Sequence, residues 1–494
     1  MAQTLPQINH AVRLSIRRSL LAPFLRRIAR RGPLTSIIES ARGNDWSAAA
    51  DRLLSRLVQH QGLGAGFHDA LRSRINHDTA AELLLTAVRK RLLLGPAEAW
   101  QTLEIQELAA SLLQQCINNE YVWFVSDEER ALLERWDEEL RCAGTSQAIE
   151  WRKLFSLAMY RSVHEIADGR FPELFDRAET MPDTGRNIVG RHLAEIKDES
   201  SLRDTIRSYG AIEREASRKV AATYERYPYP RWLDWDFPPP GTRARRLRHF
   251  FSPDELDFCS RPFNVLVAGC GTGSKAIGYA IGYGPHARIT AVDLSRTSLA
   301  YGARMARSKG LRNIDFLQMD LLDLPKLQQE FDVVECTGVL HHLEDPLEGG
   351  RAITSRVRSG GLVHISLYSE LARRGLVRLR LHYGLNPNAS DDDVRAFRRR
   401  LMTESPQSIE RELGLRGDFF DLSRCRDLLF HPLEHRFTLP GVGKLLDHLG
   451  VEFRGLQRPD LIPHQYWTPY PPDTAIRDLL AWHRFEMANP DAFT

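Results

Sequence analysis

The sequence predicts an α/β protein: a Rossmann-like, mostly parallel sheet with helices on both faces, preceded by an all-α N-terminal domain. Three observations lead to this prediction. Apolar runs of strand length alternate with helical patterns between about residues 249 and 370. A helical pattern without strand-like alternation fills most of the region before it. A stretch rich in proline and aromatic residues separates the two regions. Apolar strands that alternate with helices are typical of a parallel sheet covered on both faces.

Length and composition indicate a globular protein of two or three domains. The chain has 494 residues, of which 43% are hydrophobic and 27% charged. Its 67 Lys and Arg nearly balance 64 Asp and Glu, which argues against a dedicated nucleic-acid binder. No stretch is long and apolar enough to predict a transmembrane helix. The six cysteines form no CxxC pair, so we predict no metal site, no disulfide framework and a reducing, cytoplasmic location.

Residues 1–34 are predicted to form a basic N-terminal helix. The segment 11–31 carries seven arginines and no acidic residue, with apolar residues at roughly helical spacing. Such a segment could lie on an anionic membrane or act as a transit peptide. We prefer a solvated basic helix packed on the next domain, and the membrane surface stays an open alternative.

The helical N-terminal domain is predicted to cover residues 35–222. Segments 80–94 and 102–124 place apolar residues three and four positions apart, which favours amphipathic helices. No 34-residue repeat is visible. A connecting segment, 223–248, follows; it contains YERYPYPRW, and so many aromatic rings predict packing on a neighbouring surface rather than a simple linker.

The sheet domain is predicted over residues 249–370, with binding chemistry at the carboxyl ends of its strands. Helices are expected from Ser274 onward and over 298–310. The five predicted strands span 263–269, 287–295, 314–320, 331–338 and 360–368.

Two further segments follow the sheet domain. Residues 371–430 are Arg-rich and helical; because acidic residues interrupt the arginines, we predict a solvated helical lid over the active site rather than a nucleic-acid patch. Residues 431–494 are predicted to complete the sheet domain with a helix, a returning strand and a last helix.

Glycines at alternate positions follow the first predicted strand, in VLVAGCGTGSKAIGYA (265–280). Glycine allows sharp turns and close backbone approach to a ligand, so Gly269, Gly271 and Gly273 predict a nucleotide loop. Asp293 ends the next strand, where an acid can bond both hydroxyls of an adenosine ribose. Asp293 could equally be a turn or helix cap.

The third strand ends in a second acid, Asp320, which can reach an adenine amino group with Met319 against the ring. The predicted cofactor-binding set also includes neighbouring residues of the same loops: Cys270, Thr272, Leu294 and Leu321. Three such features in register favour an adenosine cofactor.

The spacing of the glycines is similar to the first motif of class I S-adenosylmethionine-dependent methyltransferases. A pyrophosphate cofactor would favour Gly-x-Gly-x-x-Gly, whereas position 274 is Ser. FDVVECTGVLHHLEDP (331–346) and VRSGGLVHISLY (357–368) resemble later motifs of the same family. The resemblance covers about residues 250–370 and implies a methyltransferase fold and activity, with S-adenosylmethionine as cofactor.

A narrower resemblance extends over most of the chain from about residue 105. Four segments look like signatures of a bacterial methyltransferase group that often carries tetratricopeptide repeats: QQCINNEYVWFVSDEE, YERYPYPRW, EHRFTLPGVGKLLDHLG and WHRFEMANPDAF. The resemblance implies a bacterial source and a reaction type but no particular acceptor. One position departs from the broad family, which usually has an acid two residues before the first motif glycine: this chain has Val267. The methionine end of the cofactor must therefore find other contacts.

The candidate catalytic residues follow the fourth and fifth strands. Glu335 and Thr337 are expected to contact the methionine end or the acceptor, and Tyr368 could orient the acceptor. His341 or His342 could act as a base, because histidine titrates near neutrality. Alternatively, one histidine is packed and the other solvated, and Tyr368 is a core residue.

The acceptor pocket is expected to include Tyr224, Tyr229 and Arg231 of the YPYP region, although this segment could instead be a strap between domains. The leading hypothesis is a methyltransferase acting on a protein or peptide side chain. A small metabolite, or a non-catalytic S-adenosylmethionine sensor, remains an alternative, and the glycine spacing disfavours an NAD-dependent oxidoreductase.

Overall fold

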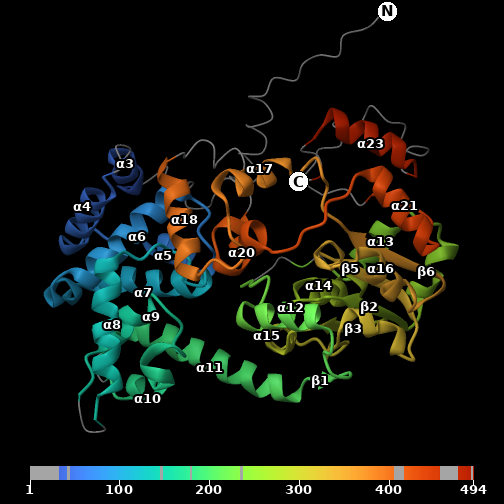
Figure 1. The fold of residues 1–494 in the computed structure, drawn as a ribbon. Helices are drawn as coiled ribbons and strands as arrows, with labels where there is room; N and C mark the ends of the chain where they lie inside the picture. Colours follow the sequence, from blue (N-terminus) through green and yellow to red (C-terminus); the bar gives the residue numbers. More distant parts are fainter. Residues whose placement is uncertain are drawn as a thin grey trace, which may run out of the picture. The chain divides into compact units, whose positions relative to one another are not determined.

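The fold was analysed in a computed structural model, which forms two compact units (Figure 1). Unit 1 comprises residues 1–194 and 388–428, and unit 2 comprises 195–387 and 429–494. The structure describes residues 33–41, 45–144, 148–178, 181–233, 237, 239–404, 417–456, 477–490 and 493. The predicted basic helix therefore lies almost wholly outside the described residues. In the part of the chain that is described, no helix is both long and apolar enough to cross a membrane.

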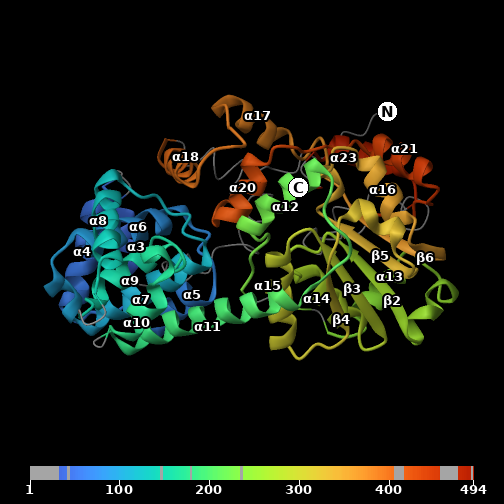
Figure 2. The same ribbon diagram turned by 60° about the horizontal axis from the view of Figure 1, so that its bottom comes forward.

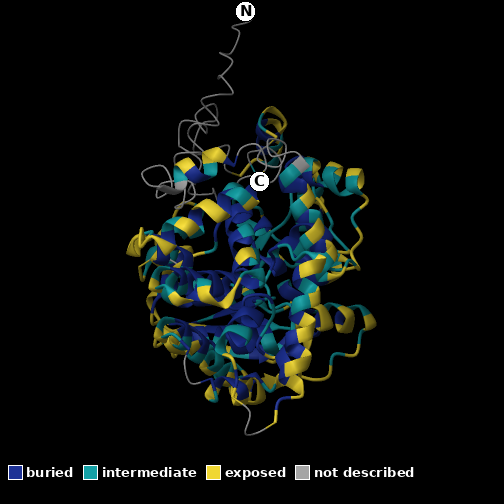
Figure 3. Cartoon of the chain, turned by 90° about the vertical axis from the view of Figure 1, so that its left-hand side faces the viewer, coloured by how far each residue is buried: buried dark blue, intermediate teal, exposed yellow. Residues whose placement is uncertain are grey.

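Unit 1 is helical, in agreement with the sequence pattern. Ser126 starts one helix with a capping box, since its backbone N–H donates to the Glu129 carboxylate at 2.8 Å. Buried and exposed residues alternate along the helices, as expected of amphipathic segments (Figure 3). The helices are α3 (Pro33–Ser40), α4 (Trp46–Val58), α5 (Ala65–Ser73), α6 (Thr79–Leu94), α7 (Leu103–Asn118), α8 (Asp127–Arg141), α9 (Trp151–Ala158), α10 (Phe171–Asp176), α11 (Asp183–Thr205), which continues into unit 2, α18 (Asp391–Glu404) and α20 (Leu422–Phe430), which ends in unit 2.

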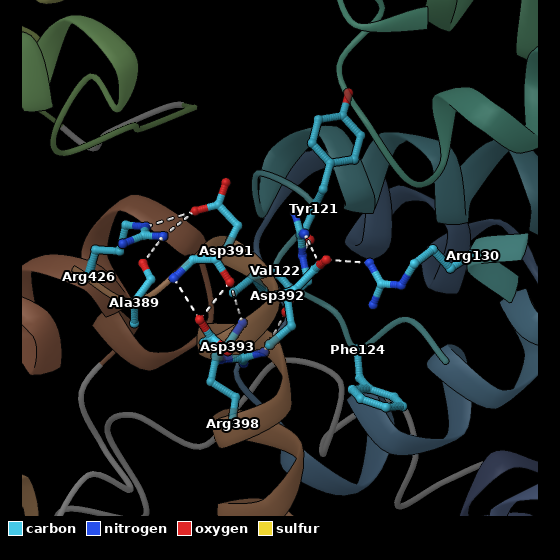
Figure 4. Close-up of polar contacts among 12 residues, drawn as sticks. Tyr121, Val122, Phe124, Arg130, Ala389, Asp391, Asp392, Asp393, Arg398 and Arg426 are labelled. Carbon is cyan, nitrogen blue, oxygen red and sulfur yellow. Dashed lines mark hydrogen bonds and ion pairs between the residues drawn. The ribbon is translucent and has the colours of Figure 1, made fainter. Parts of the chain in front are cut away.

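The segment 388–428 packs on the N-terminal helices, although it follows the sheet in the chain (Figure 4). Arg395 donates from Nε to the carbonyl of Tyr121 at 2.7 Å, and Arg130 forms an ion pair with Asp392. The Leu422 N–H donates to the carbonyl of Asn119 at 3.2 Å. The predicted lid, 371–430, is thus divided between the units. Its arginines, expected to be solvated, include several that are paired with carbonyls and carboxylates of unit 1.

Unit 2 contains a six-stranded sheet in the order β1-β4-β3-β2-β5-β6, and every described strand pair is parallel. The strands are β1 (Arg207–Ser208), β2 (Phe263–Ala268), β3 (Ala287–Asp293), β4 (Ile314–Gln318), β5 (Phe331–Thr337) and β6 (Val357–Ser366). The five predicted strands are confirmed, although β6 begins earlier than predicted. The two-residue strand β1 was not predicted, because its residues are exposed and carry no apolar pattern.

Each face of the sheet is covered by helices, which confirms the predicted Rossmann-like class (Figure 2). Val265 and Val267 of β2 lie in a core with α14 (Ser274–Tyr283) and α15 (Arg296–Ser308). Leu266 and Ala268 point to the other face, where the core includes residues of α16 (Pro346–Thr354). Side chains alternate between the faces along a strand, so residues 265–268 of β2 are all apolar because both faces are covered.

The remaining helices of unit 2 are α12 (Glu215–Arg226), α13 (Thr242–Leu247), α17 (Arg374–Tyr383), α21 (Leu439–Leu449) and α23 (Leu479–Ala488). The predicted returning strand is absent from residues 451–456, and residues 457–476 lie outside the described part. The chain passes from β2 to β3 and β4 on one side, and β5 and β6 lie on the other. The pair β2 and β5 is therefore the topological switch point, where such sheets bind ligands beyond the carboxyl ends of the strands.

Candidate active site at the carboxyl edge of the sheet

The glycine loop, residues 269–273, joins β2 to α14 at this edge. Its three glycines have positive φ angles of 68°, 52° and 80°. The Gly271 N–H donates to the Asp293 carboxylate at 2.8 Å, which ties the loop to the end of β3. Cys270 is buried, and its N–H donates to the Val292 carbonyl. The loop therefore turns sharply and lies against the ends of two strands.

Two of these glycines are also required by protein neighbours. A Cβ on Gly269 would lie 2.3 Å from a methyl of Val339, in the loop after β5. A Cβ on Gly271 would lie 2.3 Å from the carbonyl oxygen of Tyr229. The close approach at Gly271 is thus made by the YPYP segment. From the sequence, we had expected a bound ligand rather than a protein segment to require glycine here.

Replacing Gly271 by alanine is expected to destabilise unit 2 by about 1–3 kcal/mol, because φ is positive and the Tyr229 carbonyl blocks the new methyl. The thermal unfolding temperature would measure the loss. Gly278→Ala is a matched control in α14: its Cβ would meet only Phe237 at 3.5 Å, and alanine favours helices. Equal unfolding temperatures for the two variants would contradict the expectation.

Residues 214–232, here called the strap, run along the ends of three strands. The Thr272 N–H donates to the Tyr229 carbonyl at 3.2 Å, and its hydroxyl donates to the Pro230 carbonyl. The indole N–H of Trp232 donates to the Thr272 carbonyl at 3.2 Å. These bonds hold the strap on the glycine loop, beyond the end of β2.

The strap also contacts the loop after β3. The Ser295 hydroxyl donates to the Tyr224 carbonyl at 3.1 Å, and the Glu225 carboxylate accepts the Arg296 N–H at 2.5 Å. The rings of Tyr224 and Tyr229 lie 6.3 Å apart. Arg231 lies over the ring of Tyr301 in α15, with 5.8 Å between its guanidinium carbon and the ring centre. Of the three residues predicted to contact the acceptor, Tyr224 and Tyr229 therefore lie at the ends of β3 and β2. Arg231 instead packs on α15.

At the end of β3, Asp293 accepts backbone N–H groups from Gly271 at 2.8 Å and Ser295 at 3.0 Å. Burial raises the pKa of Asp293, and these amide bonds oppose the rise. A carboxylate has about four acceptor positions. Asp293 is therefore a turn-forming residue that can still accept two ribose hydroxyls, and Leu294 follows it.

At the end of β4, Asp320 is buried, together with Met319 and Leu321. One carboxylate oxygen of Asp320 accepts the Leu322 N–H at 2.9 Å, and the other pairs with Arg214 at 3.2 Å. Arg214 also reaches Asp323 at 3.1 Å, and it begins the strap. Sequence reasoning missed Arg214, since it lies more than 100 residues before Asp320.

Glu335, predicted to contact the cofactor or acceptor, is buried beneath the edge. Its carboxylate accepts hydrogen bonds from Arg243 at 2.9 and 3.2 Å and from the Tyr283 hydroxyl at 3.1 Å. His364 lies 2.5 Å away from the second oxygen. Burial would raise the pKa of Glu335, but His364 and Arg243 lower it to about 2. Arg243 is a second residue that sequence reasoning missed. Thr337 ends β5, two residues after Glu335.

The other predicted catalytic residues gather beyond β5 and β6. The buried ring of His341 stacks on Tyr368 with centres 3.8 Å apart, and it lies 4.3 Å from the ring of His342. The Nδ1 of His342 lies 2.8 Å from the Leu433 carbonyl. The guanidinium carbon of Arg373 lies 3.7 Å from the Tyr368 ring centre.

The segment 433–437 closes this cluster from one side. The His435 N–H donates to the His341 carbonyl at 2.7 Å, and the Phe437 N–H donates to the Tyr368 carbonyl at 2.8 Å. Buried Glu434 pairs with Arg373 at 2.7 Å and with Arg380 at 3.1 Å. Glu434 was not predicted, although it begins the EHRF signature.

Burial, then the neighbouring His342 and Arg373, lower the pKa of His341 to about 2. Burial likewise lowers the pKa of His342 to about 4. Both rings are therefore neutral at pH 7. With pKa values this low, His341 and His342 would be weak general bases at pH 7. They are better suited to orient an acceptor through hydrogen bonds.

The buried neutral state of His341 predicts acid sensitivity. Because the histidine pKa is about 6.5 unfolded and about 2 folded, the unfolded state binds the proton first as the pH falls. The free energy of unfolding should thus be roughly 2 kcal/mol lower at pH 5 than above pH 6.5 because of His341 alone. Urea titrations at pH 7 and 5 should give a smaller difference for His341→Asn than for the unsubstituted protein. An identical pH dependence would contradict the expectation, and replacement of the exposed His286 serves as control.

Three features of this edge fit an adenosine cofactor: the carboxylates of Asp293 at the end of β3 and Asp320 after β4, the glycine turn after β2, and the strap that contacts the ends of β2, β3 and β4. A family model described as a methyltransferase domain matches residues 265–361, which span this edge. The chain is 30% identical over 302 residues to an uncharacterized protein of Synechococcus sp., a match that covers 56% of this chain and 70% of that protein. This chain belongs to the family of S-adenosylmethionine-dependent methyltransferases.

Other similar proteins cover a smaller part of this methyltransferase. A ubiquinone biosynthesis O-methyltransferase of Chromobacterium violaceum is 31% identical over 135 residues, which are 26% of this chain and 56% of that enzyme. The solved structure of PKMT2 from Rickettsia typhi with S-adenosylhomocysteine is 14% identical, with a TM-score of 0.33 over 49% of this chain and 51% of that one. The matched region of this methyltransferase thus covers about half the length of each of those two proteins.

Proposed function

We propose that this methyltransferase transfers a methyl group to a protein or peptide side chain, and that unit 1 recognises the acceptor. One observation carries the proposal: the helical unit is assembled from two chain segments, one before and one after the sheet in the sequence, and a buried ion pair between Arg398 and Glu82 holds the second segment on the first. A minimal catalytic domain needs no such unit. A large folded unit in addition to the catalytic sheet is what recognition of a macromolecular acceptor requires.

In this proposal the cofactor supplies an activated sulfonium methyl, and the protein holds and orients the reactants. Asp293 and Asp320 would hold the adenosine, while the strap would keep water from the carboxyl edge. His341 and Tyr368, stacked beyond β5 and β6, would orient the acceptor. A neutral His341 can offer one donor and one acceptor nitrogen, which suits an uncharged amine or a hydroxyl.

A small-molecule acceptor is the second candidate, favoured by the relatives that are ubiquinone biosynthesis O-methyltransferases. A third possibility is a sensor that binds the cofactor without transferring its methyl group. Val267, which replaces an acid usual in the broad family, keeps this possibility open.

A labelling experiment distinguishes a protein acceptor, a small-molecule acceptor and a non-catalytic sensor. The full chain is incubated with methyl-labelled S-adenosylmethionine and a bacterial lysate, and macromolecules are separated from small molecules. We expect label in a protein band that is absent when Asp293→Ala replaces the unsubstituted protein. Label confined to the small-molecule fraction would overturn the protein acceptor. Cofactor binding without label in either fraction would favour the sensor.

A further inference from the structure

An excess of positive charge lies beside the stacked rings of His341 and Tyr368, where the proposed function places the acceptor. Arg373 is buried, and its guanidinium carbon lies 3.7 Å from the Tyr368 ring centre. Arg373 and Arg380 both pair with the same oxygen of Glu434, at 2.7 and 3.1 Å. Two positive charges thus face one negative charge, and the group has an excess of one positive charge.

Two further charged side chains near this cluster leave the excess unchanged. Arg436, an exposed residue, lies 3.8 Å from the second oxygen of Glu434. Glu486 of α23 is buried and accepts a hydrogen bond from the hydroxyl of Ser369, the residue after Tyr368. Arg436 adds one positive charge and Glu486 adds one negative charge. Because most of these groups are poorly solvated, water screens the excess charge only weakly.

Among the described side chains of this cluster, we find none that is suited to remove a proton from an acceptor at pH 7. Burial lowers the pKa of His341 to about 2 and that of His342 to about 4. Glu434 and Glu486 each already accept a hydrogen bond. An ammonium acceptor must lose a proton before it can attack a methyl group, and a hydroxyl must lose one as it attacks. A carboxylate is ionised at pH 7 and needs no base.

We propose that the acceptor group is the carboxylate of an aspartate or glutamate side chain, and that the product is a methyl ester. The inference rests on the proposed function, because it names the acceptor group of the same site. His341 alone would also suit an amine or a hydroxyl. The choice of a carboxylate follows from the charge of Arg373 and Arg380 beside His341, and from the lack of a base among the described side chains of the cluster.

The transfer then needs no proton movement. A lone pair of the carboxylate oxygen forms a bond to the methyl carbon, and the bond between this carbon and the sulfonium sulfur breaks with its electron pair left on sulfur. The products are an uncharged ester and the uncharged thioether of S-adenosylhomocysteine. One negative and one positive charge thus disappear together, and a poorly solvated site favours such a reaction.

The stability of the labelled bond tests this inference. The full chain is incubated with methyl-labelled S-adenosylmethionine and a bacterial lysate, and the labelled protein band is then treated with mild alkali. Methyl esters hydrolyse in alkali and release volatile labelled methanol, whereas methyl groups on nitrogen stay on the protein. We expect most of the label to become volatile. Label that stays on the protein would overturn the carboxylate but leave a protein acceptor standing. Absence of label from every protein band would contradict the proposed function itself.

Variants of Arg380 test the role of the excess charge. Arg380→Gln removes this charge and leaves Glu434 paired with Arg373. It should lower the initial rate of protein labelling roughly 10-fold, with unchanged affinity for S-adenosylhomocysteine. Arg380→Lys keeps the charge and should restore most of the rate. Arg374→Gln is the matched control, an exposed arginine of the same helix α17. An unchanged rate for Arg380→Gln, or equal losses for the Gln and Lys variants, would overturn the proposal.

Discussion

Replacing Arg398 by methionine is expected to destabilise unit 1 by about 3–5 kcal/mol, the cost of breaking a buried ion pair from one side. Arg398 is completely buried and pairs with both oxygens of Glu82, at 2.8 and 2.9 Å. It also donates to the carbonyls of Phe419 at 2.7 Å and Val122 at 3.1 Å. The variant would leave a buried carboxylate without a cation and two carbonyls without a donor.

Hydrogen exchange of α6 and α18 peptides in the full chain would localise this loss to unit 1, because the two units need not unfold together. The pair Glu82→Leu/Arg398→Met should recover much of the stability, since it removes both charges. Arg400→Met, at an exposed position of the same helix, should change stability by less than about 0.5 kcal/mol. If Arg398→Met and Arg400→Met have the same effect, the ion pair does not anchor the segment.

Arg398 also explains why the sequence did not predict that residues 388–428 of the Arg-rich segment pack in unit 1. The helical pattern was sufficient to predict α18 as a helix, because periodicity is local. The partner Glu82 is 316 residues away in sequence, and nothing in a periodic pattern indicates which domain covers a helix. Charged residues are rarely buried without a partner, so a single sequence favours solvation for an arginine run.

The strands show the opposite case. The strand β2 ends in a Val-Leu-Val-Ala run, which is apolar because both faces of a parallel sheet are covered, and that composition was visible in the sequence. The carboxyl edge was then predictable from topology: Asp293 ends β3, and Asp320 follows β4. The sequence could not show which residue contacts each polar group or glycine at this edge. Arg243 reaches Glu335 across 92 residues, and the Tyr229 carbonyl reaches Gly271 by tertiary packing alone.

Replacing Asp293 by alanine is expected to weaken S-adenosylhomocysteine binding by about 2–4 kcal/mol, because two hydrogen bonds from ribose hydroxyls to a charged acceptor are lost. Calorimetric titration measures the dissociation constant directly. The same substitution also removes the acceptor of the Gly271 N–H, so part of the loss could come from a disturbed glycine loop.

Asp332 provides the matched control for this second effect. It lies at the start of β5, at the opposite edge of the sheet, and accepts the Asn264 N–H at 2.8 Å, much as Asp293 accepts that of Gly271. It also pairs with Arg358 at 2.6 Å. Asp332→Ala should therefore lower the unfolding temperature with no change in the dissociation constant. Asp293→Ala should change the dissociation constant by far more than its unfolding temperature would suggest. An unchanged dissociation constant for Asp293→Ala would show that this carboxylate only forms the turn between β3 and α15, and the cofactor's ribose would then have to be held by other groups at the carboxyl edge.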